Sequence, residues 1–158
     1  MDIRFDERHI VVKKEERLLE LWQGENLLET FPIGLGRTPI GHKQTEGDGK
    51  TPEGEYYVCV KNSNSKYYLS LGVSYPNKED ASAALHDGRI DDQAYERIAA
   101  AIESERRPDW NTALGGAIMI HGGGSASDWT EGCVAVENEV MDILFDCCSM
   151  GTRITILP

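Results

Sequence analysis

The chain has 158 residues, of which 40% are hydrophobic and 27% charged, a composition typical of one globular domain with a real core. Its net charge of −11, with no basic cluster to offset it, argues against a nucleic-acid partner. No apolar stretch approaches the roughly 20 residues of a membrane span. The opening residues 1–6 lack the basic and apolar regions of a signal peptide. We expect a single domain over residues 1–158.

The first third of the chain is predicted to consist of strands and one long loop. Residues 9–13 are a strand candidate, and residues 17–22 and 27–33 flank a hairpin turn signal, Gln23-Gly24-Glu25-Asn26. Residues 34–50 are rich in Gly, Thr and charge and are predicted to form a loop.

The middle of the chain contains two more strand candidates and one clear helix. Residues 55–60 and 67–71 alternate in the manner of half-buried strands. Residues 72–88 are interpreted as irregular. Apolar residues then recur with a 3.6-residue period over residues 91–106, which predicts a helix that Pro108 stops.

The C-terminal region is predicted to form two short strands, a helix and a final strand. Residues 118–120 and 134–136 are short apolar runs separated by a loop of small and polar residues. Asn138 is a plausible N-cap for a helix over residues 139–150, with Gly151 just beyond its end. Residues 152–157 alternate like a sheet strand.

One imidazole and one thiol stand at the two ends of that loop. His121 ends the first apolar run and Cys133 begins the second, 133 − 121 = 12 positions later. A thiol is mostly protonated at neutral pH, and an adjacent imidazole can act as its general base and later as the acid for a leaving amine. We therefore predict Cys133 as nucleophile and His121 as its base.

Glycines next to both residues fit this chemistry. Gly132 lets the N–H groups of Gly132 and Cys133 turn toward a developing oxyanion, and the Gly122 carbonyl could fix the tautomer of His121. The run from His121 to Gly124 also spells the HGGG motif of some α/β-hydrolases, but the G-x-S-x-G elbow of that fold does not occur in the chain.

The remaining cysteines, histidines and aromatic residues have less specific interpretations. Cys147 and Cys148 are interpreted as small buried hydrophobes, and without a CxxC pair the cysteines favour neither a zinc ribbon nor a redox pair. His42 is expected to be solvent-exposed. Candidates for substrate contact are Tyr68, Trp129 and Thr130, with Trp129 equally able to pack the loop and Thr130 able to shape the turn.

Taken together, these motifs resemble the catalytic domain of the L,D-transpeptidase (YkuD-like) family, from about residue 9 to the C-terminus. The chain departs from the usual pattern at Glu131, where many members have His, and at Ala135, where many have Arg; Ala135 leaves open how a substrate carboxylate is held. The resembling segments are His121-Gly122, Thr130-Glu131-Gly132-Cys133, Asn138, Thr51-Pro52-Glu53-Gly54, Tyr68-Leu69-Ser70-Leu71, Tyr75-Pro76-Asn77, and Asp128-Trp129-Thr130, which marks one branch of the family.

The resemblance implies a mainly β fold with two or three helices, a mixed β-sandwich or partly open barrel. It implies acyl transfer on peptidoglycan stem peptides: Cys133 attacks the bond between a diamino acid and D-alanine, and an amine resolves the thioester into a 3→3 cross-link or an attachment to a D-amino acid or a protein lysine. Water as acceptor would make the protein an L,D-carboxypeptidase or an amidase. A third reading is a peptidoglycan-binding module with little turnover, since the Glu131 carboxylate would oppose thiolate formation.

The resemblance also sets expectations for partners and place. It implies a cell-envelope location in the periplasm or wall, a carbapenem adduct at Cys133, no metal or other cofactor, and a monomer.

Overall fold

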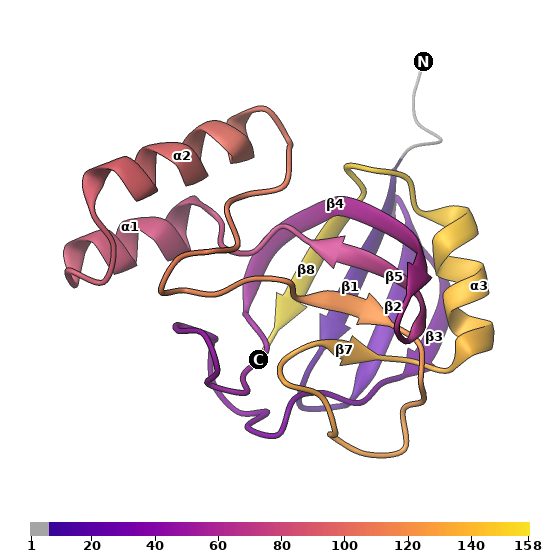
Figure 1. The fold of residues 1–158 in the computed structure, drawn as a ribbon. Helices are drawn as coiled ribbons and strands as arrows, with labels where there is room; N and C mark the ends of the chain where they lie inside the picture. The colour runs from indigo at the N-terminus through magenta and orange to yellow at the C-terminus, as the bar shows by residue number, and fades with distance from the viewer. Residues whose placement is uncertain (1–6) are drawn as a thin grey trace.

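The computed structural model describes residues 7–158; the opening residues, on which the signal-peptide expectation depends, lie outside it. The described residues form a curled, mixed sheet of eight strands in the order β3-β2-β1-β8-β4-β5-β6-β7 (Figure 1). The strands are β1 Arg8–Lys13, β2 Leu18–Gln23, β3 Asn26–Pro32, β4 Gly54–Ser65, β5 Tyr68–Val73, β6 Met119–His121, β7 Val134–Ala135 and β8 Arg153–Leu157.

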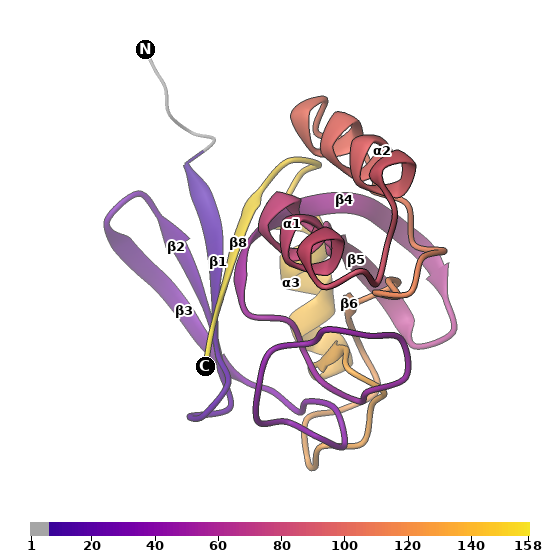
Figure 2. The same cartoon turned by 90° about the vertical axis from the view of Figure 1, so that its left-hand side faces the viewer.

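The long strand β4 joins the two halves of the sheet. Its first residues pair with β8, as in Tyr56↔Ile154, and its later residues pair with β5, as in Lys61↔Leu71. Register shifts interrupt the β4–β5 ladder, and such irregularities bend a strand and increase its twist. The sheet therefore curls along β4 (Figure 2), as the predicted half-open β architecture requires.

One helix, α3 (Asn138–Cys147), packs on the sheet beside β5 (Figure 1). Its buried residues Val140, Met141 and Leu144 recur at helical spacing. They share one hydrophobic core with inward-facing residues of strands from both halves of the sheet. Examples from the strands are Ile10, Val12, Leu19, Tyr56, Leu71, Ile120 and Ile154.

The predicted helix over residues 91–106 is confirmed as α2 (Asp92–Glu103), with Asp91 accepting the Ala94 N–H as N-cap. The expectation of irregular structure over residues 72–88 was wrong, because α1 (Lys78–His86) lies within it. Asn77 and Asp80 form a reciprocal capping box at its start, which satisfies two amides that would otherwise have no partner. The two helices lie together on one side of the molecule (Figure 1).

The prediction of α3 was wrong at both ends. Glu137 occupies the N-cap and makes no capping hydrogen bond, so the expected role of Asn138 as N-cap is not found. The helix ends at Cys147 because Cys148 is extended, with ψ of 113°. All four cysteines are free; Cys148 is buried as expected, whereas Cys147 is half-buried.

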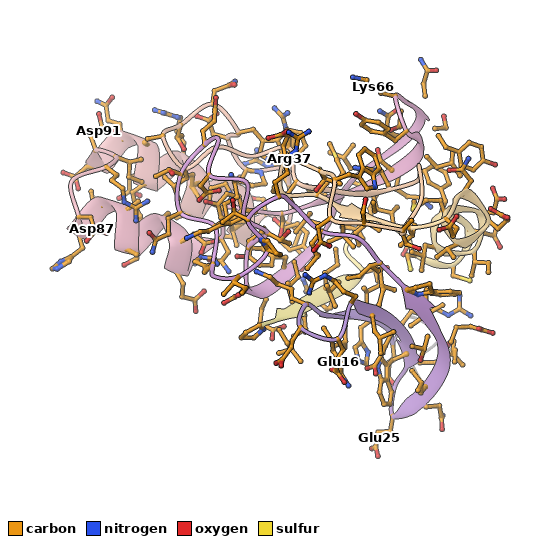
Figure 3. The ribbon with its side chains drawn as sticks, turned by 90° about the horizontal axis from the view of Figure 1, so that it is seen from below. Glu16, Glu25, Arg37, Lys66, Asp87 and Asp91 are labelled. Atoms are coloured by element: carbon orange, nitrogen blue, oxygen red, sulfur yellow. The ribbon has the colours of Figure 1, made fainter. Side chains whose placement is uncertain are left out.

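Acidic side chains mark the outer ends of the molecule. Asp87 and Asp91 lie at the connection between α1 and α2, and Glu25 lies at the β2–β3 turn on the other side (Figure 3).

Among residues 7–158, no helix has the length and apolar character needed to cross a membrane.

Leu144 provides a test of the core. Leu144 is fully buried, whereas its neighbour Ile143 is 39% exposed. We expect Leu144→Ala to lower the free energy of unfolding by about 2–5 kcal/mol, because it leaves a cavity between α3 and the sheet. Ile143→Ala is the matched control and should cost less than about 1 kcal/mol. Urea denaturation measures both, and equal losses would contradict the packing described.

Candidate active site

His121 and Cys133 are brought together by the parallel pair β6–β7. Ile120 pairs with Val134 and His121 with Ala135, so Cys133, one residue before β7, lies opposite Met119. Side chains two positions apart on paired strands point to the same face. His121 and Cys133 are therefore diagonal neighbours on one face, with Cα atoms about 8 Å apart for ordinary strand rise and spacing.

The backbone selects the tautomer of His121. Its Nδ1 lies 2.6 Å from the Gly122 carbonyl oxygen, and a carbonyl can only accept, so Nδ1 carries the proton of the neutral ring. Burial lowers the pKa of His121, and the hydrogen bond to Gly122 acts in the opposite direction. The ring is thus held neutral near pH 7, with Nε2 as the free base.

Two aromatic rings hold the imidazole in place. Tyr67 stacks on it with centroids 4.6 Å apart, and Trp129 meets it edge-on at 5.5 Å. The Trp129 indole donates to the Gly124 carbonyl at 3.0 Å. Trp129 therefore packs on the His121 imidazole, and Tyr67 is a contact that the sequence analysis did not single out.

The thiol of Cys133 faces the backbone before β6. Sγ accepts the Met119 N–H at 3.3 Å and lies 3.7 Å from the Ala117 carbonyl oxygen. Burial raises the pKa of the Cys133 thiol, while the Met119 N–H and the charge of Lys43 lower it. Among the hydrogen bonds of residues 7–158, none joins Sγ to the His121 ring, so the thiol and the imidazole are not hydrogen-bonded to each other in this structure.

The turn before Cys133 is built from hydroxyl groups. Thr51 Oγ1 donates to the Gly132 carbonyl at 2.7 Å, and Thr130 Oγ1 donates to the Cys133 carbonyl at 2.8 Å. The Gly132 N–H donates to Thr130 Oγ1 at 3.1 Å. Thr130 thus shapes the turn, and the Gly132 amide, which we expected to face an oxyanion, is already occupied.

Position 132 accepts only glycine. Its φ of +132° is unfavourable for other residues, and a Cβ there would lie 2.7 Å from the Lys50 carbonyl oxygen. The physical reason for glycine is therefore the close approach of the loop that carries Lys50, whereas the sequence analysis attributed it to the turning of two N–H groups toward an oxyanion.

Two residues at the start of α3 hold the glycine-rich segment after His121. Asn138 Oδ1 accepts the Gly123 N–H at 3.0 Å, and Glu137 Oε2 accepts both the N–H and the hydroxyl of Ser125. These contacts explain why Asn138 is not the helix cap: its side chain points back to the loop.

An ion pair anchors the same loop to the β1–β2 turn. Arg17 donates to both oxygens of Asp128, at 3.0 and 2.6 Å, and the Leu35 N–H donates to Asp128 Oδ1 at 2.9 Å. The Arg17 hydrogen bond is the main reason why the pKa of Asp128 is below its usual value. Asp128 is thus a structural carboxylate.

Cys133 opens into a pocket of about 480 Å³, within the size range of small-ligand sites. Neither Tyr68 nor Trp129 belongs to its lining, and the Tyr68 hydroxyl instead donates to Asp142 on α3 at 2.6 Å. Glu131, at the pocket, pairs with Arg37 at 3.4 Å, and both side chains are exposed. The residues that line this pocket are Lys43, Glu46, Gly47, Arg107, Trp110, Asn111, Gly116, Ala117, Ile118, Glu131 and Cys133.

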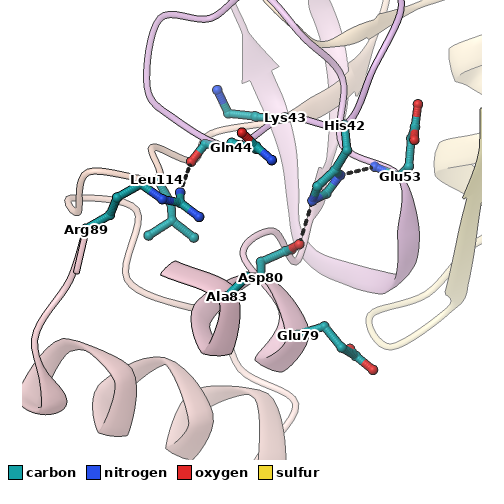
Figure 4. Close-up of a pocket in the computed structure, with 9 residues that line it drawn as sticks. All are labelled: His42, Lys43, Gln44, Glu53, Glu79, Asp80, Ala83, Arg89 and Leu114. Carbon is teal, nitrogen blue, oxygen red and sulfur yellow. Dashed lines mark hydrogen bonds and ion pairs between the residues drawn. The ribbon is translucent and has the colours of Figure 1, made fainter. Parts of the chain in front are cut away.

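A second pocket, of about 240 Å³, lies between the loop before β4 and helix α1 (Figure 4). His42 crosses it: Nδ1 accepts the Glu53 N–H and Nε2 donates to Asp80, each at 2.8 Å. The Tyr56 hydroxyl also donates to Asp80, at 2.9 Å. His42 is therefore a half-buried strut, and the expectation that it is solvent-exposed was wrong.

The curled eight-stranded sheet, with an imidazole and a thiol on one face of the parallel pair β6–β7, defines an L,D-transpeptidase-like domain. The YkuD family, described as the L,D-transpeptidase catalytic domain, matches residues 7–156. The chain belongs to this family.

Known proteins with sequence or structural similarity agree with this assignment. YafK of Escherichia coli K12, provisionally assigned as an L,D-transpeptidase, is 37% identical over 79 residues, covering 46% of this chain and 32% of YafK. Two solved structures share the fold over nearly the whole chain. One is the helical cell shape determining protein Pgp2 from Campylobacter jejuni (K307A mutant), with 21% sequence identity and a TM-score of 0.65; the match covers 94% of this chain and 46% of that chain. The other is Bdellovibrio bacteriovorus Bd1075, with 24% sequence identity and a TM-score of 0.63; the match covers 96% of this chain and 48% of that chain. The chain thus spans about a third of YafK and about half of the other two.

The raised pKa of Cys133 predicts how its reactivity depends on pH. Because the thiolate is the reactive form, the rate of iodoacetamide labelling should rise with a midpoint above the value of about 8.5 for a free cysteine. Mass spectrometry of the Cys133 peptide between pH 6 and 11 measures this, with the urea-unfolded protein as control. A midpoint at or below that of the unfolded protein would contradict the burial described.

Thr51 provides a test of the turn. We expect Thr51→Val to lower the free energy of unfolding by about 1–3 kcal/mol, because it leaves the buried Gly132 carbonyl without its donor. Thr45→Val, at an exposed position of the same loop, is the control and should change stability by less than about 0.5 kcal/mol. Urea denaturation measures both, and no loss for Thr51→Val would show that the hydroxyl is not needed.

Proposed function

We propose that the protein is a cysteine acyltransferase of the cell envelope that acts on peptidoglycan stem peptides, with Cys133 as nucleophile and His121 as base. The observation that supports the proposal is the β6–β7 register, which gives both side chains the same face of the sheet. Of the two, Cys133 lines the open pocket, and His121 is buried behind it. The tautomer of His121, with Nε2 unprotonated, supports its role as base.

The first half-reaction starts from a neutral pair. Rotation of the Cys133 side chain about Cα–Cβ moves Sγ from the Met119 amide toward Nε2 of His121, which takes the thiol proton as sulfur attacks the carbonyl between the diamino acid and D-alanine. The Cys133 N–H is the amide of this turn assigned to the oxyanion, since that of Gly132 is occupied. The carbon–nitrogen bond then breaks, and Nε2 protonates the leaving amine of D-alanine.

The second half-reaction resolves the thioester. His121 takes a proton from the incoming nucleophile, the acyl carbon bonds to it, and Cys133 leaves as the thiol. An amine of a neighbouring stem gives a 3→3 cross-link, whereas water gives a tripeptide, the outcome of an L,D-carboxypeptidase. The same thioester chemistry serves a D-amino acid or a protein lysine.

Muropeptides with tetrapeptide stems test the proposal. We expect the wild-type protein to release D-alanine and Cys133→Ala to lose at least about a thousandfold of this activity, because the nucleophile is removed. Mass spectrometry separates the acceptors: dimers mean transfer, and tripeptide alone means hydrolysis.

Two further results would bear on the proposal. A carbapenem should acylate the wild-type protein and leave Cys133→Ala unmodified, since its strained carbonyl meets the same thiol. Stem binding without product, identical in wild type and Cys133→Ala, would instead show a binding module and overturn the proposed reaction.

A further inference from the structure

One peptide group next to the imidazole is hydrogen-bonded at both of its ends. The carbonyl oxygen of Gly122 lies 2.6 Å from Nδ1 of His121 and accepts its proton. The N–H of Gly123, which belongs to the same peptide group, donates to Oδ1 of Asn138 at 3.0 Å. The Asn138 side chain, the peptide and the imidazole therefore form one continuous chain of hydrogen bonds.

The two hydrogen bonds of this peptide strengthen each other. A peptide bond is a resonance system, so a partner that accepts from its N–H moves electron density onto its carbonyl oxygen. Asn138 thus makes the Gly122 carbonyl a better acceptor for Nδ1–H. The gain is larger when His121 is positively charged, because hydrogen bonds to charged groups are stronger than those between neutral groups. Asn138 therefore favours proton uptake at Nε2, and it acts through the backbone.

The orientation of this peptide is not set by its neighbours along the chain. The Gly122 N–H donates to the Tyr67 carbonyl at 2.9 Å, which holds the peptide before it. The Gly124 N–H donates to the Val136 carbonyl at 2.9 Å, which holds the peptide after it. The peptide between them joins two glycines, and the φ of Gly123 is +108°. Because glycine adopts both signs of φ readily, this plane can turn over while both neighbours stay in place.

A turned peptide would give His121 the wrong tautomer. The Gly123 N–H would face Nδ1, which would then have to accept, and the ring proton would move to Nε2. A protonated Nε2 of a neutral ring cannot take the proton of the Cys133 thiol. The oxygen of Asn138 favours the observed orientation, in which Nε2 stays free.

The backbone of Asn138 belongs to an anchored helix. Asn138 is the first residue of α3, which begins beside the end of β6 (Figure 1) and has Val140, Met141 and Leu144 buried. A Cβ at position 122 would overlap Oδ1 of Asn138, so the side-chain amide lies directly against the peptide. Asn138 is itself exposed, so its replacement should disturb the fold little.

We propose that Asn138 is a positioning residue for the base: through the Gly122–Gly123 peptide, it fixes the tautomer of His121 and increases the affinity of Nε2 for a proton. This inference rests on the proposed function, to which it adds a side chain that acts through the backbone. It also gives a role to the asparagine of the family motif, which the sequence analysis interpreted as a helix cap.

Nuclear magnetic resonance of the His121 ring nitrogens tests the inference without turnover. In the neutral wild-type ring we expect a protonated Nδ1 and a free Nε2. Asn138→Leu has a similar size but no acceptor. It should give a mixture of tautomers and lower the pKa of His121 further, because it weakens the Gly122 hydrogen bond that raises this pKa. Asn138→Asp can only accept and adds negative charge, so it should keep one tautomer and raise the pKa of His121.

The rate at which a carbapenem acylates Cys133, followed by mass spectrometry, measures the kinetic consequence. We expect Asn138→Leu to slow acylation about tenfold, the size of effect expected for one hydrogen bond. Asn138→Asp should react at roughly the wild-type rate, because it keeps the acceptor. Glu139→Gln, at the next residue of α3 and also exposed, is the matched control and should change neither the tautomer nor the rate.

Two results would overturn the inference. One is an unchanged tautomer and pKa of His121 in Asn138→Leu, whatever the acylation rate. The other is an equal loss of rate in Asn138→Leu and Asn138→Asp without a rise in the pKa of His121 in the latter. Urea denaturation shows whether each variant is folded. If Asn138→Leu is not, Asn138→Asp decides alone: a raised pKa of His121 supports the inference, and an unchanged one overturns it. A wild-type protein that no carbapenem acylates would count against the proposed function, and the resonance experiment would still decide the role of Asn138.

Discussion

The candidate site depends on the parallel pairing of two very short strands. β6 has three residues and β7 two, too few for their own ladder to fix a register against slippage. A one-residue slip would turn Cys133 to the opposite face from His121. The register is therefore maintained by the contacts around the pair, and the structure provides them on both sides.

On one side, the segment before β4 is hydrogen-bonded to β7. The amides and carbonyls of Gly34 and Ala135 exchange two hydrogen bonds of 2.9 Å, and Thr51 binds the carbonyl before Cys133. The loop is held in turn by Lys14, whose buried Nζ donates to the Gly41 and Thr51 carbonyls and to Glu53. On the other side, Asn138 and Glu137 hold the glycine-rich segment after His121.

Much of this arrangement could be predicted from local patterns in the chain. The strands of the β2–β3 hairpin follow from alternation and a turn signal. The apolar runs before His121 and after Cys133 predicted the short strands observed as β6 and β7. Helix α1 was missed because its apolar periodicity is weak, although Asn77 and Asp80, three residues apart, are a start signal that could have been recognised.

Other features depend on contacts between distant parts of the chain. Asn138 has the residue type of an N-cap, but the Gly123 amide, 15 positions away, binds its side chain instead. Likewise Lys43 lies 90 positions before Cys133 (133 − 43), and no spacing rule connects a loop lysine to a pocket that only the folded sheet creates. The burial that raises the pKa of the Cys133 thiol is likewise encoded by no motif.

The double hydrogen bond between Gly34 and Ala135 has a consequence for how the domain can change through evolution. A Cβ at position 34 would lie 2.1 Å from the Ser127 carbonyl oxygen, so this crossing point has no room to adjust. The segment between Gly34 and Thr51, which contains Lys43, must therefore span a fixed distance. Homologues should therefore vary only narrowly in the length of this segment, since an added or missing residue would shift the turn that carries the sulfur.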